Sequence, residues 1–254
     1  MGEQARRKRW KQLFLAKHPL CCFCGGSAPA VTEDHVPARS FFGDRQWPEG
    51  YVFPACEKCN AATRLDEQVC NFLSRCYSVG DLFSPREFNA AVTALINNHS
   101  GILEELAPGF LETGRFPTRL GLPVVKVDGL QVRRAVQNYA QKLFSALHYK
   151  ETGRILPYEG GIAWSWWTNA ETFDFPPDFV ERFREMPVLR RQKDVLMDQF
   201  RYRCTVTESG EHGMYLVAFR QSFSMVGAVT CDGFFFLAKE PPPGAVILHP
   251  LRHQ

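Results

Sequence analysis

The chain lacks the features that define several protein classes. Its 254 residues contain no apolar run approaching the ~20 residues of a membrane-spanning helix. The basic N-terminus runs into Trp10 and Leu13 without the apolar segment of a signal peptide. There is no internal repeat, and 19 glycines and 17 prolines are ordinary usage, which excludes collagen-like and low-complexity chains. We therefore expect a compact cytoplasmic protein without membrane contact.

A strong charge excess is also missing. The net charge of +3 does not by itself indicate a nucleic-acid partner, but five basic residues crowd the start of the chain: Arg6, Arg7, Lys8, Arg9 and Lys11. With 45% hydrophobic residues the chain can close a core, so disorder is excluded as its main state. The basic run is predicted to contact a nucleic-acid backbone without reading sequence, and the alternative is a tail that only aids solubility.

Cysteine spacing carries the first specific signal. In a reducing cytoplasm the nine cysteines would not form a disulfide scaffold. Two C-x-x-C turns predict one tetrahedral zinc site with four thiolates, formed by Cys21, Cys24, Cys56 and Cys59. Cys22 is an alternative to Cys21 as ligand. The scattered cysteines are predicted to be buried apolar residues, as is common for free cysteine: Cys22, Cys70, Cys76, Cys204 and Cys231.

Hydrophobic periodicity predicts an α+β fold in four segments. Residues 1–20 form a basic, partly helical arm, residues 21–78 a zinc-bound finger, residues 79–160 a helical region, and residues 161–254 a β-rich C-terminal domain with an antiparallel sheet. Within the finger we expect two short strands and a helix. These elements cover residues 31–35, 51–53 and 60–77.

Further elements are expected in the last two segments. The three helices are predicted over residues 88–96, 102–106 and 132–149. The strands are predicted over residues 200–206, 214–219 and 223–230, and residues 234–237 are either another strand or a buried connection.

Three residues near the two C-x-x-C turns offer complementary chemistry. Asp34 supplies a carboxylate and Asn60 an amide oxygen, which are ligands that a hard divalent ion prefers. His35 can take a proton from water, because its neutral imidazole is populated near physiological pH. Together these groups predict hydrolysis of a phosphodiester, with a single ion neutralising the phosphate and the departing oxygen.

The sequence here resembles the HNH endonucleases, the ββα-metal or His-Me finger group, in their zinc-knuckle form. The resemblance is dense between Cys21 and Glu67 and covers about a fifth of the chain. It implies that His35 is the general base, that Asp34 and Asn60 bind a catalytic Mg²⁺ or Mn²⁺, and that the four spaced cysteines bind a structural zinc. More loosely, the stretch from Leu143 to Pro157 is similar to the segment after the finger in bacterial stand-alone HNH proteins.

One position departs from the family pattern. The middle asparagine that fixes the catalytic histidine has no counterpart before Cys56, where Glu49 and Tyr51 stand instead. Either of these side chains, or a backbone carbonyl, is expected to orient the ring of His35.

Arginines near the predicted site are candidates for holding phosphate. Arg39, Arg45 and Arg64 flank it, and the planar guanidinium matches phosphate oxygens.

Other charged and aromatic groups are predicted to be structural. Asp66 and Glu67 suit a helix N-terminus, the tryptophans at 164, 166 and 167 suit a core, and the arginine pairs at 133–134 and 190–191 suit helix surfaces.

The resemblance implies an endonuclease that cuts duplex DNA, with RNA not excluded, and that leaves 5′-phosphate and 3′-hydroxyl ends. By analogy it suggests a defence or mobile-element nuclease acting as a monomer or a homodimer. The rival hypothesis is a zinc-stabilised module that binds nucleic acid or a ligand without cutting. Nicking of plasmid separates the two hypotheses, because only a nuclease produces it.

Overall fold

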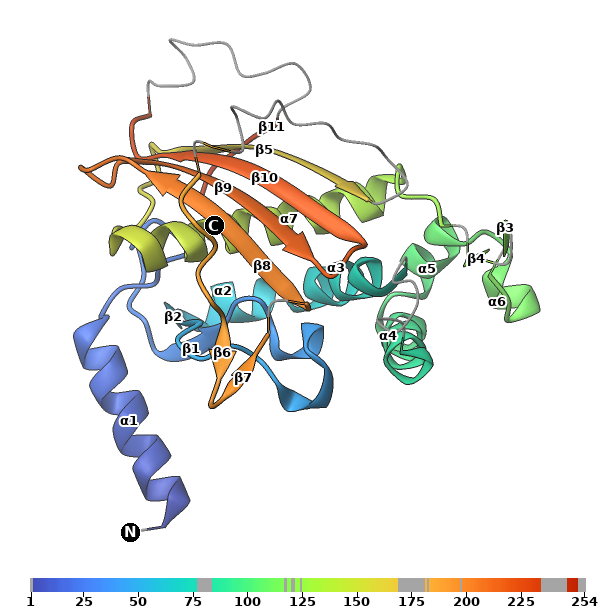
Figure 1. Cartoon of the computed structure of the whole chain (residues 1–254), viewed down its shortest axis with the longest axis horizontal. Helices are drawn as coiled ribbons and strands as arrows, with labels where there is room; N and C mark the ends of the chain where they lie inside the picture. The colour runs from blue at the N-terminus through green and yellow to red at the C-terminus, as the bar shows by residue number, and fades with distance from the viewer. Residues whose placement is uncertain are drawn as a thin grey trace.

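The protein has an α+β fold in which an antiparallel sheet packs on a long helix (Figure 1). The computed structural model describes residues 2–76, 84–116, 118–119, 122–123, 125–168, 181, 183–196, 198–233 and 246–250. Residues 234–237, interpreted as a strand or a buried connection, and the predicted helix end at Tyr77 lie outside these ranges. No helix within these ranges is both long and apolar enough to cross a membrane.

The N-terminal arm is the helix α1 (Glu3–Lys17), as predicted. None of its residues is buried, and it extends away from the rest of the protein (Figure 1). Trp10 and Phe14 stack on each other along one side, with ring centroids 5.2 Å apart. The basic residues of α1 are therefore open to a large charged partner.

A ββα unit follows. Strand β1 (Thr32–His35) pairs antiparallel with β2 (Val52–Ala55), and the loop between them holds two short 3-10 turns, η1 (Arg39–Phe41) and η2 (Gly43–Arg45). The helix predicted to begin at Asn60 begins earlier, because Cys56 caps α2 (Glu57–Ala62) by accepting a hydrogen bond from the Cys59 amide at 3.4 Å. The chain then breaks at Thr63 and continues as α3 (Arg64–Cys76).

The middle of the chain is helical, as predicted. It comprises α4 (Pro85–Asn98), α5 (Ser100–Leu106), α6 (Phe110–Thr113) and α7 (Leu130–Thr152), with the small strands β3 (Thr118–Arg119) and β4 (Leu122–Pro123) before α7. Ser84 caps α4 through a hydrogen bond from the Glu87 amide, and Pro85 occupies the first turn, where its missing N–H costs nothing.

The C-terminal part forms a five-stranded antiparallel sheet. Its order is β11 (Val246–Leu248), β5 (Gly161–Thr168), β10 (Phe223–Thr230), β9 (His212–Phe219) and β8 (Phe200–Val206). A separate two-stranded ribbon precedes β8, formed by β6 (Arg190–Arg191) and β7 (Asp194–Val195). Alternating burial along β8, β9 and β10 turns one face of the sheet toward α7. The sequence predicted the antiparallel strands but not this packing partner.

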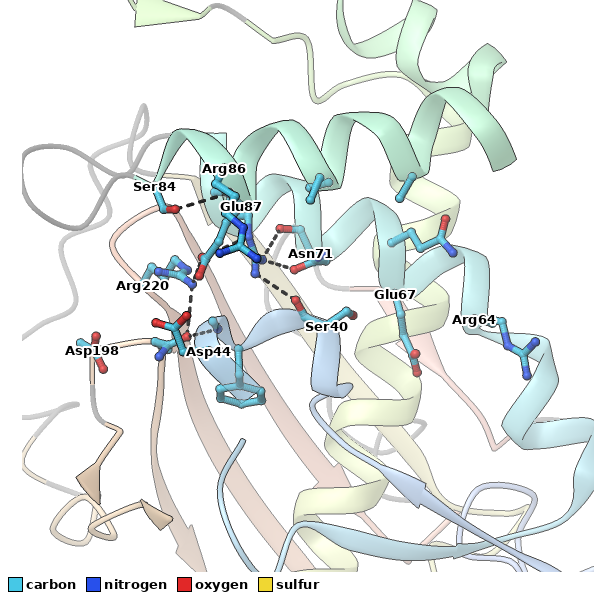
Figure 2. A pocket seen from close by; sticks show the side chains of 18 residues that line it. Ser40, Asp44, Arg64, Glu67, Asn71, Ser84, Arg86, Glu87, Asp198 and Arg220 are labelled. Carbon is cyan, nitrogen blue, oxygen red and sulfur yellow. Dashed lines mark hydrogen bonds and ion pairs between the residues drawn. The ribbon is translucent and has the colours of Figure 1, made fainter. Parts of the chain in front are cut away.

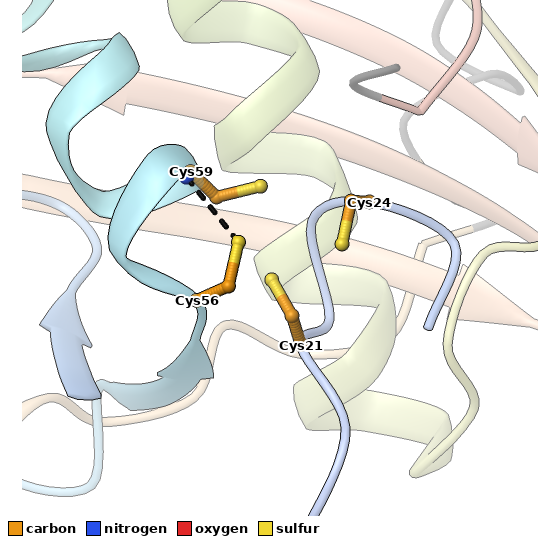
Figure 3. A group of neighbouring side chains, drawn as sticks. All are labelled: Cys21, Cys24, Cys56 and Cys59. Carbon is orange, nitrogen blue, oxygen red and sulfur yellow. Dashed lines mark hydrogen bonds between the residues drawn. The ribbon is translucent and has the colours of Figure 1, made fainter. Parts of the chain in front are cut away.

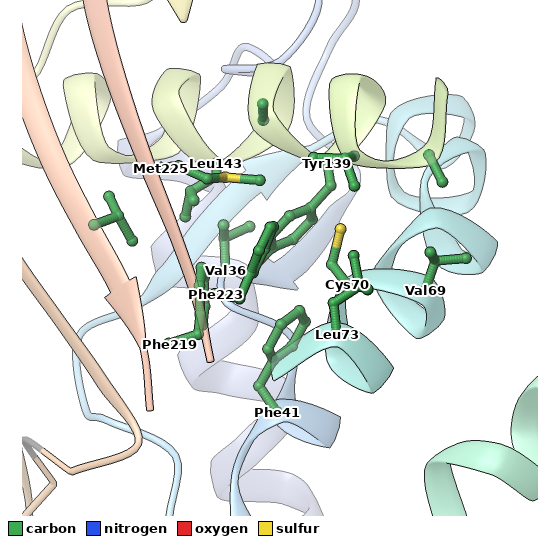
Figure 4. Packing of buried hydrophobic residues seen from close by; sticks show 14 of the residues in the cluster. Val36, Phe41, Val69, Cys70, Leu73, Tyr139, Leu143, Phe219, Phe223 and Met225 are labelled. Carbon is green, nitrogen blue, oxygen red and sulfur yellow. The ribbon is translucent and has the colours of Figure 1, made fainter. Parts of the chain in front are cut away.

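One core joins the finger, the helices and the sheet (Figure 4). Phe41 from the finger loop stacks on Tyr139 of α7, with centroids 5.2 Å apart, and contacts Phe219 of β9 at 5.0 Å. Cys70 and Leu73 of α3 are buried in the same cluster. The finger thus shares its core with the rest of the protein.

Candidate functional site

Four buried thiols meet where the first turn of the finger approaches the start of α2 (Figure 3). The sulfur atoms of Cys21, Cys24, Cys56 and Cys59 all lie within 4.8 Å of one another. Tetrahedral zinc with Zn–S bonds of about 2.3 Å requires sulfur atoms about 3.8 Å apart. The donor set and its spacing therefore fit zinc, as the sequence predicted.

One of the four thiols is much more acidic than the others. A hydrogen bond from Cys59 lowers the pKa of Cys21 to about 5, and the same bond is the main cause of the raised pKa of Cys59. A dication would stabilise all four thiolates at once, because the thiolate is the form that binds metal. Cys22 is buried beside the cluster but is not part of it.

His35 ends strand β1 on the same face as Glu33, because alternate residues of a strand share a face. Its Nε2 atom lies 2.9 Å from a terminal nitrogen of Arg39. Burial, followed by the charges of Arg39, Arg7 and Arg191, lowers the pKa of His35 to about 4. The imidazole is therefore neutral at pH 7, and Nε2 accepts a hydrogen bond from Arg39, which assigns the ring proton to Nδ1.

An aromatic platform holds two of these arginines. The guanidinium of Arg39 lies 4.4 Å from the centroid of the Trp47 ring, and that of Arg191 lies 4.0 Å from it. The same ring meets His35 edge-on at 6.5 Å. Such cation–π contacts fix the direction of a guanidinium without consuming its hydrogen-bond donors. Arg191 was predicted to lie on a helix surface; it lies in β6, and its approach to His35 was not foreseen.

Asp34 points to the opposite side of β1, into the protein. Its carboxylate lies 2.6 Å from the ammonium of Lys142 on α7, which also contacts Glu67 of α3 at 2.5 Å. Burial raises the pKa of Asp34 and that of Glu67, and Lys142 opposes both shifts. Burial alone lowers the pKa of Lys142, but the two carboxylates outweigh it and the pKa is raised. Glu67 lies in the first turn of α3, where the helix dipole was predicted to favour it, and its contact with Lys142 was not foreseen.

Asn60 bridges α2 and β1. Its amide nitrogen donates to Thr32 Oγ1 at 3.3 Å and to the carbonyl of Glu33 at 3.4 Å. The two predicted metal ligands, Asp34 and Asn60, therefore have different partners. A divalent ion on the Asp34 carboxylate would lie against the Lys142 ammonium, so the pair as arranged does not fit an open Mg²⁺ or Mn²⁺ site.

Neither side chain offered in place of the middle asparagine orients His35. Glu49 accepts a hydrogen bond from the Gln192 amide, and Tyr51 donates to Tyr202. Arg39 and Trp47 contact the imidazole instead.

The other predicted phosphate-binding residues separate into groups. Arg7 lies 3.8 Å from Glu33 and contributes to the field on His35. Arg6, Lys8 and Arg9 are exposed on α1. Arg64 is exposed at the start of α3 and lines a different cavity, and the side chain of Arg45 lies outside the described part of the chain.

Comparison with known proteins finds no match. No protein family, no curated protein and no solved structure is similar enough to the chain to be assigned to it.

Proposed function

We propose that the protein is a zinc-stabilised endonuclease of the HNH type that hydrolyses phosphodiester bonds, with DNA as its substrate. One observation carries the proposal. A neutral histidine stands at the end of a ββα unit with the charges of Arg39, Arg7 and Arg191 around it. A phosphodiester brought to these cations would lie beside an imidazole able to deprotonate water.

The chemistry follows from the tautomer of His35. When a phosphate oxygen takes over the hydrogen bond of Arg39, Nε2 of His35 becomes free to accept a proton from water. The resulting hydroxide oxygen bonds to phosphorus, the opposite P–O bond breaks, and the departing oxygen takes a proton from solvent. Arg39 and Arg191, held on Trp47, would stabilise the additional negative charge on the phosphoryl oxygens.

A divalent ion, Mg²⁺ or Mn²⁺, belongs to the proposal because the sequence resemblance implies one with Asp34 and Asn60 as ligands. The ion pair between Asp34 and Lys142 does not fit that role as arranged. Side chains of this protein and solvent therefore carry the proton transfers of the proposed reaction, and comparison of Mg²⁺, Mn²⁺ and EDTA measures whether an ion is needed.

The second candidate is a nucleic-acid-binding module that does not cut, acting alone or as a homodimer. The specific observation in its favour is that the Asp34 carboxylate is already the counterion of Lys142. The exposed basic residues of α1 would serve either function, because phosphate contacts supply affinity without sequence information. Either function is compatible with a role in defence or in a mobile element.

Plasmid DNA separates the two candidates. Wild-type protein is incubated with supercoiled plasmid in Mg²⁺, in Mn²⁺ and in EDTA, and both nicking and electrophoretic retardation are recorded. The nuclease proposal predicts nicking that His35→Ala abolishes without loss of retardation. A binding module would retard the plasmid and leave it supercoiled under all three conditions. His35→Ala would change neither result. Equal zinc content and equal circular dichroism ensure that the variant is folded.

A further inference from the structure

The two-stranded ribbon of β6 and β7 has one buried face and one exposed face. At its base the amide of Leu196 donates to the Leu189 carbonyl at 3.0 Å, and both leucine side chains are buried. Arg190 and Val195 pair with each other at the next position, where the alternation along a strand turns side chains to the opposite face. Both residues are exposed, Val195 by 53%. The outer face of the ribbon is therefore open to solvent.

The inner face is attached to the loop between β1 and β2. Arg191 lies over the Trp47 ring and donates to the Trp47 carbonyl at 3.2 Å. The carboxylate of Glu49 accepts a hydrogen bond from the Gln192 amide at 3.2 Å. Because the Trp47 ring also meets His35 edge-on, these contacts fix the ribbon relative to the proposed general base.

The outer face and the turn of the ribbon carry unpaired cations. Arg190 lies on that face, and Lys193 is exposed in the turn between the two strands. In the described part of the chain, neither side chain takes part in an ion pair. The ribbon's own acid, Asp194, belongs to the inner face and accepts a hydrogen bond from Gln46 at 3.3 Å. Both cations are therefore available to an anionic partner.

The buried arginines at the cavity between α3 and α4 differ in this respect (Figure 2). Arg220 lies 2.8 Å from the Glu87 carboxylate, and the Nε atom of Arg75 lies 3.7 Å from the same oxygen. The side chains of Arg220 and Arg75 are only 8% and 6% exposed. These two arginines are engaged in internal contacts, whereas the cations of the ribbon face solvent.

Helix α1 and the ribbon bring positive charge to His35 from two distant parts of the chain. Helix α1 reaches the site through Arg7, which lies 3.8 Å from Glu33, and the ribbon reaches it through Arg191. The charges of Arg7 and Arg191 both contribute to the lowered pKa of His35. Both elements project on the same side of the protein, away from the five-stranded sheet (Figure 1). A polyanion that contacts both elements would therefore run past His35.

We propose that the outer face of this ribbon binds duplex DNA and, together with α1, positions the duplex alongside His35. The inference rests on the proposed function, because it takes DNA as the partner of the same site. A duplex carries one phosphate charge per about 1.7 Å of its axis, twice the density of a single strand, so it can meet cations on two separate projections at once. The major groove also admits a two-stranded ribbon. Arg190 and Lys193 contact phosphates and supply affinity without reading sequence.

Fluorescence anisotropy of a short labelled DNA duplex, recorded without added divalent ion, measures binding apart from cleavage. The double variant Arg190→Gln, Lys193→Gln should weaken duplex binding about 10-fold and reduce the slope of log affinity against log salt by about 1.8, because each phosphate contact contributes about 0.9. The matched control is Lys126→Gln with Arg133→Gln, which removes two exposed cations at and before α7. It should change neither the affinity nor the slope.

Val195→Glu tests the same face without removing a cation. The new carboxylate stands directly opposite Arg190, so it pairs with that arginine and repels phosphate. Duplex binding should weaken, whereas Val195→Gln, which has the same size and no charge, should leave it unchanged. Equal zinc content and equal circular dichroism ensure that the variants are folded.

The proposal is overturned if the wild type does not bind the duplex, if Val195→Glu and Val195→Gln bind it equally well, or if a single strand of the same sequence binds as tightly as the duplex. Its failure is distinct from that of the nuclease proposal. A wild type that binds the duplex through the ribbon and never nicks plasmid rejects the nuclease and supports the ribbon as a DNA-binding surface. Nicking by wild type, with duplex binding unchanged in all ribbon variants, rejects the ribbon and leaves the nuclease standing.

Discussion

The ammonium of Lys142 lies 2.6 Å from the carboxylate of Asp34, one residue before the proposed general base. The same ammonium contacts Glu67, so a buried lysine joins α7 to β1 and to α3. This triad fixes the end of β1 from inside the protein, while Arg39 and Trp47 fix His35 from outside. His35 is thus oriented by groups from both sides of a short strand.

Lys142→Met should destabilise the protein strongly. The substitution leaves the carboxylates of Asp34 and Glu67 buried without their shared cation. Breaking a buried ion pair by removing one partner costs about 3–5 kcal/mol. Urea unfolding at pH 7 measures the loss, and Lys126→Met, at an exposed lysine before α7, serves as the control. A loss below about 1 kcal/mol would contradict the buried triad.

The loss in Lys142→Met should shrink as the pH falls. Burial raises the folded-state pKa of Asp34 and of Glu67, so without Lys142 both groups take up protons more readily in the folded than in the unfolded chain. Neutral carboxyls no longer need a cation. Unfolding of the variant at pH 7 and at pH 5 tests this, and an equal loss at both values would contradict it.

The contribution of Asp66 to the free energy of unfolding should become more favourable as the pH falls from 7 toward 4, because its carboxyl group takes up a proton. Burial raises the pKa of Asp66 to about 6, although a hydrogen bond from Asn138 opposes the shift. The native state therefore binds more protons than the unfolded chain between about pH 4 and pH 6, and the destabilisation present at pH 7 is relieved as pH falls through 6. Asp66→Asn should raise the free energy of unfolding at pH 7 by about 1 kcal/mol. It should also flatten its pH dependence in that window, whereas an unchanged dependence would contradict the shift.

Removing the zinc ligands should unfold the finger. A structural zinc supplies about 10–16 kcal/mol in small fingers, and here the thiols connect residues 21–24 to α2. Wild-type protein should carry one zinc per chain by elemental analysis, and Cys59→Ser should lose it together with protease resistance near β1. Cys231→Ser, at a half-buried cysteine outside the cluster, should retain both. Full zinc content in Cys59→Ser would contradict the assignment.

Arg39 should control the acidity of His35. The charge of Arg39 is the second cause, after burial, of the lowered pKa of His35. Arg39→Gln should therefore raise that pKa from about 4 toward its ordinary value, as measured by the NMR titration of the imidazole. Arg64→Gln, outside the groups that act on His35, is the matched control. An unchanged titration in Arg39→Gln would mean that the contact between Arg39 and His35 is not formed.

The parts of the site that were predicted from sequence are those encoded locally. The two C-x-x-C turns give the zinc ligands by spacing alone, and the adjacent D-H pair gives a histidine at a strand end. The longer helices and the strands β8, β9 and β10 followed from periodicity, whereas the break at Thr63, the cap at Cys56, the strand β5 and the short ribbon of β6 and β7 were missed. The cap uses a sulfur atom, which lies outside the usual serine, threonine, aspartate and asparagine signal.

The parts that were missed depend on residues far apart in the chain. A lysine on a helix is normally solvated, and only the approach of β1 and α3 buries Lys142. The side chain of Arg191 in β6 lies over the ring of Trp47 and donates a hydrogen bond to the Trp47 carbonyl, 144 positions away in the chain. Neither packing event leaves a periodic signature, so local patterns could not reveal it.

The pH dependence of plasmid nicking by wild type and His35→Ala tests the central claim most directly. With a His35 pKa of about 4, the base is neutral from pH 6 to pH 8, so the wild-type rate should vary little across that range and fall only below pH 5. His35→Ala, with equal zinc content and equal DNA affinity, should be slower by about 10²–10⁴-fold. A variant that nicks plasmid as fast as wild type, or a wild type that binds DNA and never nicks it, would contradict the account.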